Sequence, residues 1–411
     1  MERSNARSRF VIRIGSKPHM VLLLIAIFYV AFFPTSIGGR IIGSMWMVRN
    51  LSAIVIAIIV TQKNKILRKP FYYTLFLLLW MTLLSFTTKA FYNNGNNDFS
   101  IAWASISGLL PTLLLWCVKF NDNYLDVNEA KKIFHVFTII LLVWGWGLVF
   151  GIGFITNFTS AFFSQLNENM FTNMVTLRGK PVMSFGTHSM SSFFMLIVYF
   201  LHCVELKEGK GDWKNYVYMA LLFALVVPMS SNTSLLVMVV MTILFLWTNN
   251  THLTRFIALF VLAIGIFYAF RQGNLTEFVY SIIRGTNSQA HGITARYLND
   301  TYKTNIEIAL NYIGVGFLRS DSGVIRMNDS GIIYLFTQGN IVSVILSYGL
   351  MYAFMRRNMS KYGKITFLIF FIWEFISAST FISVKMIFAH IMTIILINSF
   401  VHSDINNEGI E

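Results

Sequence analysis

Charged residues are scarce in this sequence. Asp, Glu, Lys and Arg make up 12% of the 411 residues, whereas hydrophobic residues make up 55%. A water-soluble domain of this length needs a far larger polar surface to enclose such an apolar interior. The scarcity of charge therefore argues against a soluble fold, and it directs the search for function to the few polar residues within apolar stretches.

The signatures of several kinds of site are missing as well. The eight histidines are scattered without metal-ligand spacing, and no P-loop for a nucleotide is present. No Asp-Asp or Asp-x-Asp pair occurs in the segments predicted to face outwards, as a metal-dependent oligosaccharyl transferase would show. We therefore expect no metal and no other cofactor. The net charge of +14 gathers on no single domain, so nucleic acid is not an expected partner.

Only two cysteines are present, Cys117 and Cys203, and both fall near helix ends predicted to face the cytoplasm. Thiols stay reduced there, so we predict that both are packing residues. The first apolar run is a full span with no small-residue cleavage site after it, which argues against a cleavable signal peptide.

Long apolar stretches dominate what remains. Runs of about 20 apolar residues span a bilayer as helices. The sequence predicts an all-α polytopic membrane protein with about twelve transmembrane helices, forming a single integral membrane domain over residues 1–411. The predicted helices are 19–36, 42–61, 71–92, 100–118, 133–156, 182–204, 215–229, 233–248, 256–270, 332–355, 365–380 and 384–400.

Basic residues gather in alternate connections between these helices, and such clusters mark the cytoplasmic side. Both termini are therefore predicted to be cytoplasmic. One large external loop, 271–331, has apolar and aromatic residues at helical spacing, as at 278–283 and 302–310. We expect short amphipathic helices there, lying on or dipping into the outer leaflet.

Four polar residues fall inside predicted helices, in the half nearer the outside: Arg49, His188, Glu374 and Lys385. Charges at such depth are costly unless they face a cavity or a partner. They suggest a water-filled cavity open to the outside. Two alternatives remain open: Glu374 and Lys385 form a structural ion pair, and Arg49 extends its charge to the membrane surface.

Three patches resemble the bacterial superfamily of O-antigen polymerases and O-antigen ligases. The first is Leu-Arg-Gly-Lys-Pro at 177–181, followed by Phe-Gly-Thr-His-Ser at 185–189. The second is Ala-Arg-Tyr at 295–297 with a Gly-Val-Gly at 314–316. The third runs from Asn328 to Tyr334, with Gly339 and Asn340 following. A Ser-rich patch at 230–234 is similar too, although it lacks the Arg often found there.

This resemblance implies a GT-C-like fold in the bacterial plasma (inner) membrane, with the active site on the external, periplasmic side. It implies a glycosyltransferase that uses a glycan carried on undecaprenyl pyrophosphate, with membrane lipid and a chain-length regulator as further partners. A polymerase of O-antigen or capsule transfers the growing glycan to the next lipid-linked repeat unit, whereas a ligase transfers it to lipid A–core.

The resemblance also implies roles for particular residues. Arg178 and Arg296 would stabilise the charge that develops on the pyrophosphate leaving group, and His188 or Asp329 would act as the base for the acceptor hydroxyl. The alternatives are purely structural roles: His188 as a hydrogen-bonded core histidine and Asp329 as a helix N-cap. Further predicted substrate-binding residues are Arg49, Lys180, Arg284, Arg319, Tyr334, Glu374 and Lys385.

A third hypothesis belongs to a different class. A flippase or other transporter of lipid-linked oligosaccharides would show internal repeats, polar residues near the midplane and short loops on both faces. The single large external loop and the outward bias of the polar residues count against it.

Overall fold

The computed structural model describes residues 18–32, 55, 58–60, 64–91, 113–120, 125–159, 181, 183, 188–229, 232–248, 307, 310, 313–316, 330–376 and 384–401. This part is mostly helical. The elements are α1 Pro18–Phe32, β1 Lys65–Ile66, α3 Arg68–Phe91, β2 Val118–Lys119, α5 Val127–Val149, α7 His188–Lys207, α8 Trp213–Val226, α9 Asn232–Thr248, α14 Gly331–Asn358, the 3-10 turn η2 Ser360–Tyr362, α15 Gly363–Ile376 and α16 Val384–Val401.

The described helices lie where the sequence pattern predicts helices, although some of their bounds differ, and the predicted helix 100–118 ends in the strand β2. Each of α1, α3, α5, α7, α8, α9, α14, α15 and α16 overlaps one predicted helix. The predicted helices 42–61, 100–118 and 256–270, and the loop 271–331, lie wholly or largely outside the described residues. The total of twelve spans and the external loop therefore stay predictions.

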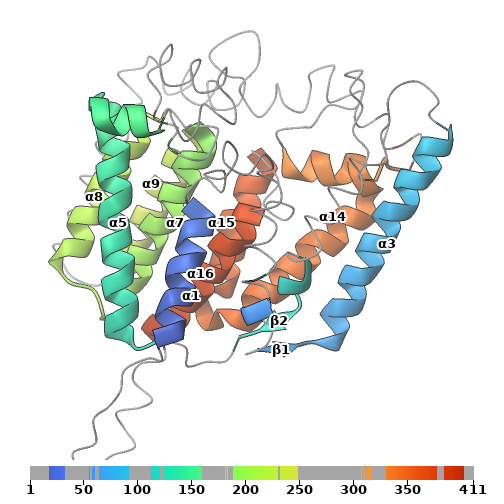
Figure 1. The fold of residues 1–411 in the computed structure, drawn as a ribbon, viewed down its shortest axis with the longest axis horizontal. Helices are drawn as coiled ribbons and strands as arrows, with labels where there is room; N and C mark the ends of the chain where they lie inside the picture. The colour runs from blue at the N-terminus through green and yellow to red at the C-terminus, as the bar shows by residue number, and fades with distance from the viewer. Residues whose placement is uncertain are drawn as a thin grey trace, which may run out of the picture.

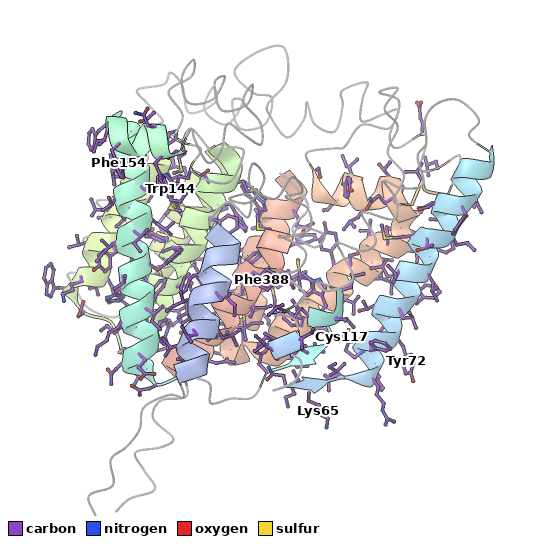
Figure 2. All side chains as sticks on the ribbon, viewed as in Figure 1. Lys65, Tyr72, Cys117, Trp144, Phe154 and Phe388 are labelled. Atoms are coloured by element: carbon purple, nitrogen blue, oxygen red, sulfur yellow. The ribbon has the colours of Figure 1, made fainter. Side chains whose placement is uncertain are left out.

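Four helices within the described residues are long and apolar enough to cross a membrane: 68–87, 127–149, 190–207 and 331–358. Some of their apolar side chains face outwards. On α3, Tyr72, Phe76, Leu79 and Phe86 are all more than half exposed, at intervals of three to seven residues. Figure 2 shows Tyr72 on the outer side of α3 and Phe388 in the middle of the bundle. An exposed apolar helix face of this extent is typical of a surface that contacts lipid.

The helices stand side by side in a bundle (Figure 1). One side holds α5, α7, α8 and α9, the other holds α3 and α14, and α1, α15 and α16 lie between them. We call the two ends of the bundle upper and lower, as drawn in Figure 1. The short antiparallel pair β1–β2, which joins Lys65 to Lys119, closes the lower end beside the start of α3.

The core centres on α7 and α16. Every described side chain from 191 to 205 on α7 and from 386 to 400 on α16 is buried or nearly so. Both helices also carry polar residues, among them Glu205 and His390, that are fully buried. Polar side chains of membrane helices face the interior of the bundle, so the positions of α7 and α16 agree with their composition.

The end of α5 differs from its prediction. The helix was expected to reach residue 156, but it ends at Val149. Gly151 adopts a φ of 65°, its N–H bonds to the Leu148 carbonyl, and the Ile152 N–H bonds to the Gly147 carbonyl. This is a Schellman ending, which uses a left-handed glycine to satisfy the last carbonyls of a helix. The apolar residues continue past this glycine, so hydropathy alone extended the helix too far.

The helix predicted at 332–355 also differs, because α14 is broken. Gly339 (φ −148°, ψ 25°) and Asn340 (φ 57°, ψ −164°) leave the helical conformation. Figure 1 shows the part before the break running across the upper end of the bundle, while the part after it descends to the lower end. Only the second part therefore runs along the bundle.

Candidate functional site

Most of the residues predicted to act on substrate lie outside the described residues. These are Arg49, Arg178, Lys180, Arg284, Arg296, Arg319 and Asp329. Their roles stay predictions. One alternative is corrected: the N-cap position of α14 is Ser330, so Asp329 precedes the cap.

The other four predicted residues lie on helices whose ends meet at the upper end of the bundle. His188 is the first residue of α7, Tyr334 lies in the first part of α14, Glu374 is in the last turn of α15, and Lys385 is in the first turn of α16. The opposite ends of two of these helices are joined at the lower end, where Glu208 after α7 contacts Lys361 before α15. These positions, far apart in sequence, thus belong to helix segments at the same end of the bundle.

The break in α14 is bound by a second segment, 313–316. A break frees backbone carbonyls that a continuous helix would satisfy. The N–H groups of Val315 and Gly316 donate to the carbonyls of Thr337 (3.0 Å) and Gln338 (2.7 Å). Trp80 of α3 donates its Nε1–H to the Gly339 carbonyl at 2.9 Å. The second and third family-like patches therefore touch each other directly.

The contact between these two segments is very close. Gly316 has a φ of 62°, and a Cβ there would lie 2.2 Å from the Met81 carbonyl oxygen. Ile313, with a φ of 60°, and Asn340 hold the left-handed region without being glycine. Such conformations cost free energy and gather at functional sites when the surrounding structure imposes them. Only glycine at 316 lets the segment lie against α3 and α14 together.

Two polar contacts complete the upper end. Gln338 donates from Nε2 to the hydroxyl of Tyr334 at 2.8 Å, and its buried Oε1 has no hydrogen-bond partner among the described residues. Glu374 is fully buried and accepts a hydrogen bond from Tyr348 of α14 at 2.5 Å. The predicted pairing of Glu374 with Lys385 falls partly outside the described side chains and stays a prediction.

A cluster of ionisable residues that sequence reasoning missed lies at the lower end. His135 of α5 contacts both carboxylate oxygens of Glu205 at 3.0 Å, and Glu205 lies at the end of α7. Asn215 of α8 donates to Glu205 at 2.6 Å and contacts His202 Nδ1 at 3.0 Å. Lys131 Nζ lies 3.6 Å from Glu205. The carboxylate, His202 and Asn215 are fully buried.

The protonation of His202 follows from its partners. Thr138 donates its hydroxyl hydrogen to the Phe134 carbonyl at 2.9 Å, so we infer that it accepts from His202 Nε2 at 3.1 Å. His202 Nδ1 then carries a lone pair and accepts from Asn215. This neutral tautomer satisfies both ring nitrogens.

His135, His202 and Glu205 present ligand atoms within 4.8 Å of one another, and such a set binds transition metals in proteins. The neighbours do not suit a cation. Asn215 directs an N–H at the carboxylate, and the Lys131 ammonium lies beside it. We interpret the cluster as a hydrogen-bond and ion-pair network that joins α5, α7 and α8. Its only sequence signal is the His202-x-x-Glu205 spacing within an apolar helix.

A second polar contact at the lower end joins α7 to η2. Glu208 pairs with Lys361 at 2.8 Å and accepts a short hydrogen bond from the Tyr362 hydroxyl. Burial and the neighbouring Glu208 carboxylate raise the pKa of the Tyr362 phenol above its ordinary range, so it stays a donor.

Comparisons of the chain with protein-family models, with curated proteins and with solved structures give no match.

Proposed function

We propose that this membrane protein is a glycosyltransferase that polymerises a surface polysaccharide. It would transfer a growing glycan from undecaprenyl pyrophosphate to the next lipid-linked repeat unit. The proposal starts from the resemblance of three sequence patches to the O-antigen polymerase and ligase superfamily. It requires a membrane domain, and the long apolar helices are consistent with one.

One structural observation gives the proposal its main support. Segment 313–316, from the second patch, donates two backbone hydrogen bonds to the break in α14, which belongs to the third patch. His188, from the first patch, begins a helix that starts at the same end of the bundle. The described residues of the three patches thus lie at one end of the bundle, which supports a shared site.

The proposed chemistry needs no metal, because a pyrophosphate is already a good leaving group. Arg178 and Arg296 would supply positive charge to the departing pyrophosphate through their planar, bidentate side chains. His188 or Asp329 would take the proton from the acceptor hydroxyl. Gln338 Oε1, which has no hydrogen-bond partner within the described part of the chain, would accept a hydrogen bond from a sugar hydroxyl.

The decisive experiment is chain growth from a synthetic undecaprenyl pyrophosphate-linked repeat unit with the purified protein, read as a ladder on a gel. Wild-type protein should extend the chains, whereas Arg178→Lys and Arg296→Lys should slow extension at least about tenfold because the bidentate fork is lost. Arg68→Lys, at the lower end, is the matched control and should leave the ladder unchanged. Normal ladders from both Arg→Ala variants at normal protein levels would exclude these roles.

The deletion strain separates polymerase from ligase. A surface that carries single repeat units indicates a lost polymerase. Full-length chains that stay on the lipid carrier, with none on lipid A–core, indicate a lost ligase and would move the proposal to that acceptor.

A transporter of lipid-linked oligosaccharides is the second candidate, and the broken helix α14 favours it. Transporters often build substrate sites from discontinuous helices. The break comes only about eight residues into this 28-residue helix, however, nearer the upper end than the middle. Repeat units that accumulate on the inner leaflet of a deletion strain would identify a transporter, whereas exported but short glycans would identify the transferase.

A further inference from the structure

A groove of about 700 Å³ lies at the lower end, between the start of α3 and the second part of α14. Its volume is within the usual range for ligand pockets of ~300–1,000 Å³. The walls are largely apolar and include Leu67, Tyr73, Leu346 and Leu350. The sequence places this end in the cytoplasm, remote from the predicted external site.

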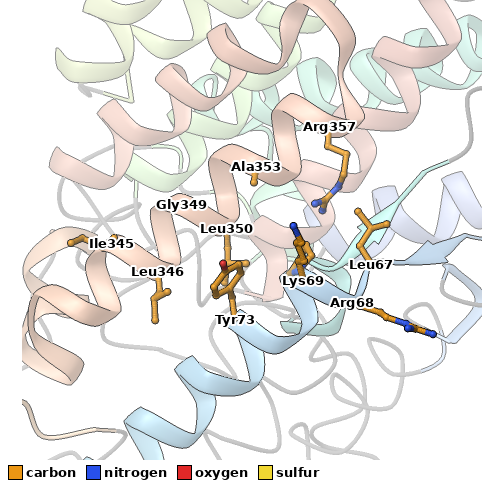
Figure 3. Close-up of a pocket in the computed structure, with 11 residues that line it drawn as sticks. Leu67, Arg68, Lys69, Tyr73, Ile345, Leu346, Gly349, Leu350, Ala353 and Arg357 are labelled. Atoms are coloured by element: carbon orange, nitrogen blue, oxygen red, sulfur yellow. The ribbon is translucent and has the colours of Figure 1, made fainter.

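Positive charge lines one part of the groove. Arg68, Lys69 and Arg357 contribute to its lining, and none of the described lining residues is a carboxylate. Figure 3 shows Lys69 of α3 and Arg357 of α14 extending toward each other, while Arg68 points away. Two converging cations repel each other unless an anion lies between them. Within the described residues, no salt bridge supplies that anion for either cation.

The Arg357 side chain is held in place. Its Nη2 donates to the carbonyls of Trp116 (3.0 Å) and Val118 (3.3 Å), just before and within β2. The next residue, Asn358, is tied to the same strand through Val118 and Phe120. Carbonyl oxygens orient the guanidinium but leave its charge uncompensated. Its Nε–H is buried, and no described residue accepts a hydrogen bond from it.

We propose that this groove binds an anionic phospholipid of the adjoining leaflet, with the lipid phosphate between Lys69 and Arg357. The fixed guanidinium would offer N–H groups to phosphate oxygens, and the flexible ammonium would close from the opposite side. Basic pockets between transmembrane helices on the cytoplasmic side bind such headgroups. A free anion would use the cations but would leave the apolar walls unused.

The apolar part of the groove has room for the upper part of an acyl chain. Gly349 lines it, and a Cβ at Gly349 would meet nothing within 4 Å. A larger side chain there would fill the space without changing any charge. The inference rests on the membrane location of the bundle and does not depend on the proposed transferase activity.

Native mass spectrometry of the purified full-length protein tests the proposal, with phosphatidylglycerol and phosphatidylcholine of identical acyl chains as probes. Wild-type protein should bind one phosphatidylglycerol more tightly than phosphatidylcholine. Lys69→Gln should weaken phosphatidylglycerol binding about fivefold, as expected for one lysine near a membrane surface. Gly349→Leu should reduce the binding of both lipids at this site.

Arg68→Gln is the matched control, because it removes a neighbouring charge that points away from the groove, and it should weaken phosphatidylglycerol binding less than Lys69→Gln does. Lys69 is exposed, so Lys69→Gln should fold normally. Equal binding of the two lipids, or equal losses in Lys69→Gln and Arg68→Gln, would overturn the proposal. Inorganic phosphate binding as tightly as the lipid would reassign the groove to a free anion, and preference for a polyprenyl phosphate would replace the proposed occupant.

Discussion

At the scale of single residues, the Glu205 carboxylate is fully buried. Hydrogen-bond donors of α5 and α8 surround it. His135 and Asn215 bond to it directly, and the Lys131 ammonium lies 3.6 Å away. The group is stable because every charge and donor has a partner. The network joins α5, α7 and α8 at one point.

Glu205→Gln should therefore lower the free energy of unfolding by about 3 kcal/mol, because it leaves buried donors facing an amide N–H₂. Thermal unfolding of the protein in detergent, followed by size-exclusion chromatography, measures the effect. Asp212→Asn is the control. Asp212 is 3.6 Å from the same Lys131 but its side chain is 41% exposed, and asparagine retains the N-cap of α8. Equal losses in the two variants would show that the buried network contributes no more than a surface pair.

Glu374 is likewise a fully buried carboxylate, at the upper end of the bundle. Its carboxylate accepts a hydrogen bond from Tyr348, and sequence predicts a second partner in Lys385. Tyr348→Phe should lower the free energy of unfolding by about 2 kcal/mol, the usual value of a hydrogen bond to a charged group.

The Lys385 pairing has its own test. Glu374→Gln should reduce stability or chain extension, and adding Lys385→Met should partly restore it, because one buried charge left alone costs more than none. Additive losses in the double variant would show that the residues are not a pair and would make Glu374 a candidate base.

At the scale of elements, α14 depends on segment 313–316. Two N–H groups of that segment and the indole of Trp80 satisfy carbonyls that the break releases. A helix break at membrane depth is tolerated when protein groups satisfy the freed backbone. The break is therefore a property of three segments together and not of α14 alone.

Gly316→Ala should disrupt this assembly. The added Cβ would meet the Met81 carbonyl and the Ser85 hydroxyl at 2.2 Å, in a backbone conformation that alanine rarely adopts. We expect a loss of more than about 2 kcal/mol in stability and a strong loss of chain extension. Gly153→Ala is the matched control, because the space beside Gly153 is open and its φ is not in the left-handed region. A Gly316→Ala protein as stable and active as Gly153→Ala would contradict the proposed role of the contact.

For the whole molecule, the basic residues predict one orientation in the membrane. Lys65 and Lys361 are exposed at the lower end of the bundle, and basic residues predict that this end is cytoplasmic. Both native cysteines are buried and free, so they should add little background to thiol labelling.

Lys65→Cys should resist impermeant thiol reagents in intact cells, and Ser288→Cys, in the predicted external loop, should react with them. Both should react after the cells are broken open, which controls for accessibility. The reverse pattern would invert the protein and place the proposed lipid groove in the outer leaflet.

The sequence by itself determined the class of this protein and the approximate positions of the described helices, because apolar runs of span length have few stable alternatives to membrane helices. It could not locate the ends of α5 or the break in α14. Those depend on the left-handed Gly151 and on the donors from Val315, Gly316 and Trp80, to which hydropathy is insensitive.

Tertiary structure alone decided which polar residues meet. Glu374 was conspicuous in the sequence as a charge in an apolar helix, but its contact with Tyr348 requires α14 and α15 to pack together. His135 and Glu205 are 70 residues apart, and Lys69 and Arg357 are farther apart still. Their proximity is set by how helices pack, and spacing along one chain carries no information about contacts between helices whose relative rotation is unknown.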